Sequence, residues 1–144
     1  MGQGALPSQA QAFVACRDII KDQYTSTFLL VGPFQEIALD TFPAQFCLSL
    51  YVQLLGGTGT DALDVQLRGG DGQVVWQGPW PESPGAAEPG MAVPSALDDV
   101  TVPFPRPGRY DLVLRAKGQD LAHYALRVKR QSKAQLGPGE SGPR

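Results

Sequence analysis

Residues 104–128 read FPRPGRYDLVLRAKGQDLAHYALRV, and this stretch has the pattern of a closing β-hairpin. Apolar side chains occur at every second residue on both arms, at Tyr110, Leu112, Leu114, Ala122, Tyr124, Leu126 and Val128. Such alternation is typical of strands that place one face on a core. Gly118, between the two arms, can adopt the positive φ that a tight hairpin turn requires. The chain is therefore expected to be a β protein.

Shorter segments with strand character follow one another along the rest of the chain. Outside the hairpin, strands are predicted over residues 12–16, 27–31, 36–40, 46–55, 63–68, 73–77 and 100–104. The Gly69–Gly72 linker predicts a second hairpin, because glycine-rich turns join antiparallel strands. No segment keeps helical spacing over ten or more residues, although Ser95–Asp99 could cap a single helical turn.

Length and composition favour a single all-β domain. The 144 residues are 42% hydrophobic, which suits one domain, and the 13 prolines and 17 glycines suit many tight turns better than helices. We expect one antiparallel β-sandwich of immunoglobulin-like or C2-like type, with about eight or nine strands and little or no helix. The sandwich is assigned to residues 11–130, with a flexible tail at 1–10 and a disordered Gly/Pro-rich tail at 131–144.

Tyr110 and the two cysteines are given structural roles. Tyr110 follows a Pro-Gly turn at the start of the penultimate strand, as in a tyrosine corner, where the hydroxyl bonds to upstream backbone. Cys16 and Cys47 lie in two separate apolar strand segments, so both are expected to be reduced, buried thiols.

Charge and hydropathy exclude two classes of partner. The formal net charge of −2 arises from scattered acids and bases and creates no broad positive field for nucleic acid. No segment approaches the roughly 20 consecutive apolar residues of a membrane helix, and the first residues do not resemble a signal peptide. We therefore expect a cytoplasmic protein that binds neither nucleic acid nor membrane.

Candidate chemical sites are sparse. His123 is the single histidine, on the predicted outward face of the last strand, and no serine or cysteine lies near it in sequence. The Asp98-Asp99 pair and the isolated turn aspartates lack calcium-loop spacing, and two cysteines with one histidine do not make a zinc site. We expect no catalytic residue, no metal and no cofactor.

Two tryptophans flank the start of a proline-rich segment at residues 78–94. Trp76 is expected in the core, whereas Trp80 could be either a core residue or a surface anchor. The weak binding hypothesis is that Trp80, with Pro79, Pro81 and Met91, marks a contact surface on this loop.

Four segments together resemble a family of small bacterial proteins of unknown function. They are Phe13–Cys16 followed by Asp18, the apolar run Phe28–Gly32, the step Phe42-Pro43, and the turn Pro107–Tyr110. The resemblance spans roughly residues 11–130 and implies a bacterial, single-domain, all-β protein without an assigned activity. It transfers no functional residues. The chain departs from the family outline in its first residues and in a proline-rich insertion after Trp80.

Three functional hypotheses remain open from the sequence. The first is a non-catalytic protein-interaction module, since the edges of an open sandwich can accept a partner strand or pair in a homodimer. The second is a small-ligand or carbohydrate-binding domain that uses the 78–94 loop. The third, an enzyme, would depend on His123 and a cysteine.

Overall fold

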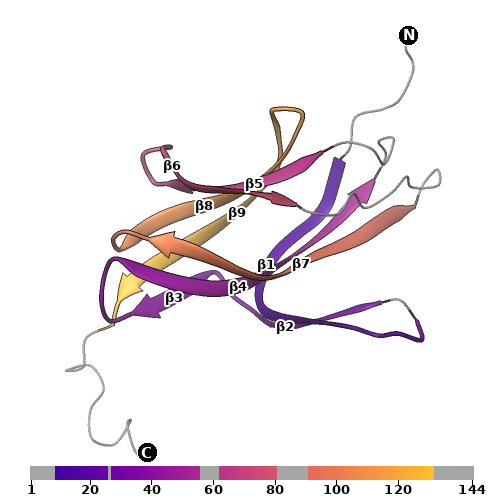
Figure 1. The fold of residues 1–144 in the computed structure, drawn as a ribbon, viewed down its shortest axis with the longest axis horizontal. Coiled ribbons are helices and arrows are strands. Elements are labelled where there is room, and N and C mark those ends of the chain that lie inside the picture. The colour runs from indigo at the N-terminus through magenta and orange to yellow at the C-terminus, as the bar shows by residue number, and fades with distance from the viewer. Residues whose placement is uncertain (1–8, 26, 56–61, 81–90, 132–144) are drawn as a thin grey trace, which may run out of the picture.

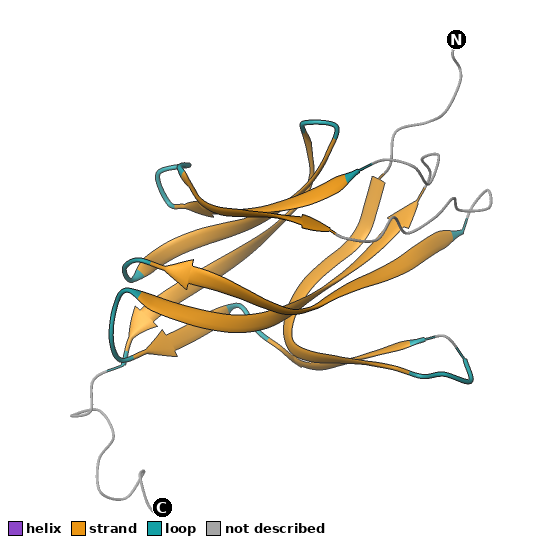
Figure 2. Ribbon diagram, viewed as in Figure 1, coloured by secondary structure: helices purple, strands orange, loops and turns teal. Residues whose placement is uncertain are grey.

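A computed structural model describes residues 9–25, 27–55, 62–80 and 91–131 of the chain. These residues form nine β-strands, and they contain no helix (Figures 1 and 2). The strands are β1 (Gln9–Lys21), β2 (Phe28–Pro33), β3 (Glu36–Leu39), β4 (Ala44–Leu55), β5 (Leu63–Gly69), β6 (Val74–Trp80), β7 (Ala92–Phe104), β8 (Gly108–Ala116) and β9 (Gln119–Arg130). The predicted all-β fold is confirmed. Of the expected tails at 1–10 and 131–144, residues 1–8 and 132–144 lie outside the described residues, whereas Gln9 and Ala10 belong to β1.

The strands form two sheets that pack face to face. One sheet has four strands in the order β2-β1-β4-β7, and the other has five in the order β3-β9-β8-β5-β6. All pairings are antiparallel except that of β3 with β9, which is parallel. The predicted two-sheet sandwich is confirmed, with this one parallel pairing as an unexpected feature.

The core fills the space between the sheets with the apolar positions of the alternating strands. Its largest fully buried side chains include Phe104, Leu48, Leu50, Leu67, Leu112 and Leu114. Apolar side chains alternate along β4 and β5, and those of one face are buried because the two facing sheets exclude water from one side of each strand. Trp76 is partly buried and packs against this core, and its ring covers Gly78, two residues further along β6.

Both predicted hairpins are present, with glycine where the turn requires it. Lys117 (φ 54°) and Gly118 (φ 76°) form a two-residue turn between β8 and β9, as in a type I′ turn. Gly72 (φ 86°) lies in the turn between β5 and β6.

The predicted helical turn at Ser95–Asp99 is wrong, because these residues belong to β7. Their pairing with β4 shifts register between Leu48 and Leu50, and Asp99 adopts a positive φ of 57° at this irregularity. The polar residues that suggested a helix cap therefore occupy a bulge in an edge strand. The 100–104 strand accordingly begins earlier than predicted, at Ala92.

No helix among the described residues has the length and apolar character needed to cross a membrane.

Candidate functional site

Trp80 lies in the core rather than on a contact surface. Its side chain is 5% exposed, and its indole N–H donates a hydrogen bond of 2.9 Å to the Ser95 hydroxyl across the sandwich. The indole therefore offers no open ring face for stacking a sugar. Pro79 and Met91 are exposed, whereas Pro81 lies outside the described residues.

His123 lies on the outer face of the five-stranded sheet among carboxylates. Its Nδ1 is 2.6 Å from an oxygen of Asp111, and its Nε2 is 3.6 Å from Asp120. Neither partner has a hydroxyl or thiol, which are the nucleophiles that an imidazole base activates. In the described ranges, no group of three or more metal-ligating side chains comes together.

Asp120 joins this histidine to two arginines. Arg68 binds the carboxylate through both terminal nitrogens, at 2.9 and 3.0 Å, and Arg115 approaches it at 3.2 Å. The hydrogen bonds from Arg68 hold the pKa of Asp120 below its ordinary value. Arg68 is on β5 and Asp120 on β9, so the pair spans the intervening strand β8.

The burial of Val113 shows the structural role of the polar network formed by Arg68, Arg115, Asp120 and His123. It pairs with His123 on β9 and with Gln66 on β5, so it shares their outer face, and yet it is fully buried. Long polar side chains can cover apolar surface with their stems while keeping their charged ends in water. The network on this face therefore shields an apolar side chain.

The two cysteines differ in their surroundings, contrary to the expectation that both are buried. Cys16 is fully buried on β1, whereas Cys47 on β4 is exposed. The Cys16 thiol lies 3.3 Å from the Asp18 carbonyl and 3.7 Å from that of Ser49, and burial raises the pKa of this thiol. Both cysteines are free, as predicted.

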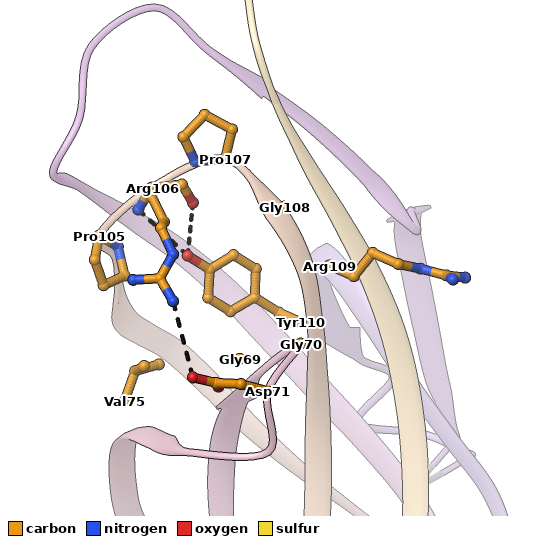
Figure 3. Close-up of a pocket in the computed structure, with 10 residues that line it drawn as sticks. All are labelled: Gly69, Gly70, Asp71, Val75, Pro105, Arg106, Pro107, Gly108, Arg109 and Tyr110. Carbon is orange, nitrogen blue, oxygen red and sulfur yellow. Dashed lines mark hydrogen bonds and ion pairs between the residues drawn. The ribbon is translucent and has the colours of Figure 1, made fainter.

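A small cavity of about 190 Å³ opens beside Tyr110 at one end of the sandwich (Figure 3). The tyrosine hydroxyl donates a hydrogen bond of 2.6 Å to the Arg106 carbonyl, which confirms the predicted tyrosine corner. Arg106 also approaches Asp71 at 4.0 Å, whereas Arg109 points away from the cavity (Figure 3). The polar groups that define this cavity thus bond to one another.

The hairpin of β1 and β2 exposes large apolar side chains. Ile20 is 51% exposed, Leu29 61% and Val31 40%, and Tyr24 in the turn is 98% exposed. Ile20 pairs directly with Leu29, and Val31 lies two residues further along the same strand, so these three share one face of the hairpin. We refer to Ile20, Leu29 and Val31 as the β2 patch.

The β2 patch lies on an edge strand, at the outer side of the four-stranded sheet (Figure 1). The sequence of β2, FLLVGP, contains no charged residue. The Asp22 N–H donates a hydrogen bond of 2.8 Å to the Thr27 carbonyl, so the backbone groups of Thr27 point toward β1. In an antiparallel pair the facing groups alternate, so the N–H and C=O groups of Phe28 and Leu30 point toward the open edge.

The other three edge strands carry features that discourage further pairing. β7 has the Asp98-Asp99 pair and its bulge, and β6 has Pro79. β3 has only four residues, and its Glu36 forms an ion pair of 3.2 Å with Lys129. Charges, prolines, bulges and short length are the means by which sheet edges avoid association. The segment Phe28–Val31 of β2 lacks these features, and the strand becomes irregular only at Gly32, which has a φ of 65°, and at the terminal Pro33.

The sequence predicts a strand at 27–31 but does not single out this hairpin. The available signal was the unbroken apolar run of Phe28–Val31, which lacks the polar alternation of a half-buried strand. Ile19-Ile20 supplies a second apolar pair on the neighbouring strand, and Ile19 is buried while Ile20 is exposed. Sequence periodicity does not distinguish such a run from a strand covered on both faces.

Comparisons with known proteins give the following matches. A family model described as "Family of unknown function (DUF6941)" matches residues 11–129. No curated protein matches the chain. Among solved structures, an immunoglobulin-like protein from Pseudomonas aeruginosa is similar with a TM-score of 0.44 and 13% sequence identity, over 86% of this chain and 98% of that one.

Proposed function

We propose that this chain, which belongs to that family of unknown function, is a non-catalytic protein-interaction module. Its partner supplies an extended segment that adds to the open edge of β2. The observation that carries the proposal is the combination, on one edge strand, of unpaired backbone groups and exposed apolar side chains.

The backbone of β2 supports affinity for an extended segment. The outward groups of Phe28 and Leu30 can each donate and accept a hydrogen bond, which is the interaction that an added strand makes. Because these bonds involve main-chain atoms, they place few restrictions on the partner's sequence.

The side chains of the β2 patch support selectivity. An added strand presents alternate side chains to the face that carries Ile20, Leu29 and Val31, so apolar residues at every second position of the partner would be favoured. Exposed apolar clusters of this kind commonly mark protein-interaction sites, and an exposed aromatic residue such as Tyr24 is a frequent contact residue.

A displayed library of random peptides of about nine residues tests the proposal. The folded protein is expected to select peptides with alternating apolar residues and without central proline. Their binding should fall at least about tenfold for Leu30→Pro, since proline lacks the N–H that Leu30 directs to the edge.

The matched control is Leu30→Ala. Both substitutions remove the leucine side chain, but only proline removes the edge donor, so Leu30→Ala should retain more of the binding. Circular dichroism checks that each variant keeps its β-sheet signal. A selection without enrichment, or peptides that bind Leu30→Pro as well as wild type, contradicts the proposal.

A further inference from the structure

We infer that the partner strand at this edge is β2 of a second copy of the same chain, in antiparallel pairing about a two-fold axis. This inference rests on the proposed function and specifies its partner. Pairing would join two four-stranded sheets into one continuous sheet, with the two β2 strands at its centre.

The outward N–H and C=O groups of Leu30 fit a two-fold axis that passes through this residue. With Leu30 opposite its own copy, the N–H of each donates to the C=O of the other, because both groups point outward. The next outward residue, Phe28, then faces Gly32 of the second copy, where a φ of 65° takes the backbone out of the strand conformation and ends the regular pairing.

The side chains of the β2 patch are self-complementary in this register. Leu29 of each copy lies opposite Val31 of the other, and Ile20 lies beside Leu29 on the neighbouring strand. The patches of the two copies therefore meet on one face and form a continuous apolar stripe. A two-fold interface requires such a self-matching surface, since the same residues serve both sides.

Charge favours a second copy over a strongly charged partner. β2 has no charged residue, so the closest strands bring no like charges together. The adjoining part of the hairpin has two bases, Arg17 and Lys21, and two acids, Asp18 and Asp22, which balance each other. The formal charge of the whole chain is only −2, so the long-range repulsion between copies is small.

Sedimentation velocity of the full chain over a range of concentrations tests the inference. The paired segment is short, so we expect a reversible dimer with a dissociation constant above about 1 μM. Leu30→Pro should weaken dimerisation at least about tenfold, and Leu30→Ala should weaken it less. Leu29→Asp provides a second variant, since it places two carboxylates in the apolar stripe without changing the backbone.

Cysteine cross-linking tests the register. In a Cys47→Ser background, Leu30→Cys should form an intermolecular disulfide with oxidised glutathione, since directly opposed residues of a hydrogen-bonded pair have Cα atoms about 5.5 Å apart. Val74→Cys is the matched control, because Val74 is also exposed (47%) but lies on the β6 edge.

The outcomes separate the inference from the proposed function. A chain that remains monomeric at every concentration, or a dimer unaffected by both Leu30→Pro and Leu29→Asp, overturns the inference. Equal cross-linking at Leu30→Cys and Val74→Cys does the same. Peptides that still bind β2 of a monomeric protein would leave the proposed function standing, whereas peptides and dimer lost together would remove both.

Discussion

Tyr110 covers the core at one end of the sandwich. Its ring is buried against Phe104, with ring centroids 5.0 Å apart, while its hydroxyl reaches the Arg106 backbone. The same side chain therefore fills the core and fixes the turn that enters β8. This dual role accounts for an aromatic residue with a polar end at this position.

We predict that Tyr110→Phe lowers the free energy of unfolding by about 1 kcal/mol, because the ring remains but the hydrogen bond to Arg106 is lost. Urea denaturation followed by tryptophan fluorescence measures the change. Tyr24→Phe is the control, since the Tyr24 side chain is 98% exposed, and it should leave stability unchanged. Equal effects of the two substitutions would contradict the assignment.

Asp120 leads to a prediction about pH. Its pKa is lowered in the folded chain by Arg68, so the stability it contributes is present above its ordinary value of 3.8 and is lost as pH falls through the lowered pKa. Asp120→Asn should therefore destabilise the protein at about pH 7, by about 1 kcal/mol or less because the pair is partly exposed.

At about pH 2, wild type and Asp120→Asn should unfold at nearly the same urea concentration, since the wild-type carboxylate is then protonated. Urea titrations at the two pH values measure the difference. Asp40→Asn serves as the control for removing a carboxylate outside the network. A difference that is the same at both pH values would show that charge is not the source of the stabilisation.

At the scale of elements, tight turns set the register of the hairpins. The Lys117-Gly118 turn places Ala116 opposite Gln119, and a one-residue register shift at Leu121 then aligns Leu114 with Ala122 and the rest of β8 with β9. A shift of one residue would move every core side chain of β9 to the outer face. The turn and the irregularity at Leu121 together decide which side of β9 is buried.

We predict that Gly118→Ala costs about 1 kcal/mol, because Gly118 has a φ of 76° that residues with a Cβ rarely adopt. Gly118→Asn should cost less, since asparagine tolerates this conformation. Steric overlap is a minor factor, as an added Cβ would lie 3.9 Å from Arg115. Thermal unfolding of both variants tests the order, and asparagine as costly as alanine would contradict it.

Strand positions were predictable from the sequence because burial on one face imposes a period of two. The hairpin of β8 and β9 and the tyrosine corner are examples, since each depends on residues close together in the chain. The parallel pairing of Glu36 with Arg127 was not predictable, because nothing local specifies which distant strand β3 joins. The exposure of Cys47 was missed because the thiol was assigned to the core by its residue type, although the alternation of its segment places it on the face opposite Leu48 and Leu50.

The β2 patch could not be identified from sequence for a related reason. Leu29 and Val31 have the composition of buried residues, and their exposure depends on where the sheet ends. Trp80 illustrates the opposite case, since a tryptophan beside a proline-rich segment suggested a surface role and is buried against Ser95. All three residues lie on edge strands, so their burial is decided by which face of the strand meets the other sheet.

Across the whole molecule, protection of backbone amides from hydrogen exchange is expected to decrease from the central strands to the edge strands. β8 lies between β9 and β5, and Leu112, Val113 and Leu114 are fully buried within it. We predict that their amides exchange with deuterium only on global unfolding, whereas the outward amides of Phe28 and Leu30 exchange much faster in dilute solution.

Hydrogen exchange followed by NMR tests this gradient, and higher protein concentration should slow exchange at Phe28 and Leu30 alone if these edges pair. Amides of β2 that are as protected as those of β8 in dilute solution would contradict the assignment of an open edge.

The parallel pairing of β3 with β9 also constrains how the protein is made. Glu36 leaves the ribosome early, but its partner Arg127 must first be synthesised and clear the exit tunnel. At about 5–20 residues per second, the delay is on the order of ten seconds. During that interval β1, β2 and β4 can pair, while their core side chains still face water. We expect chaperones that bind nascent chains to bind the protein at this stage.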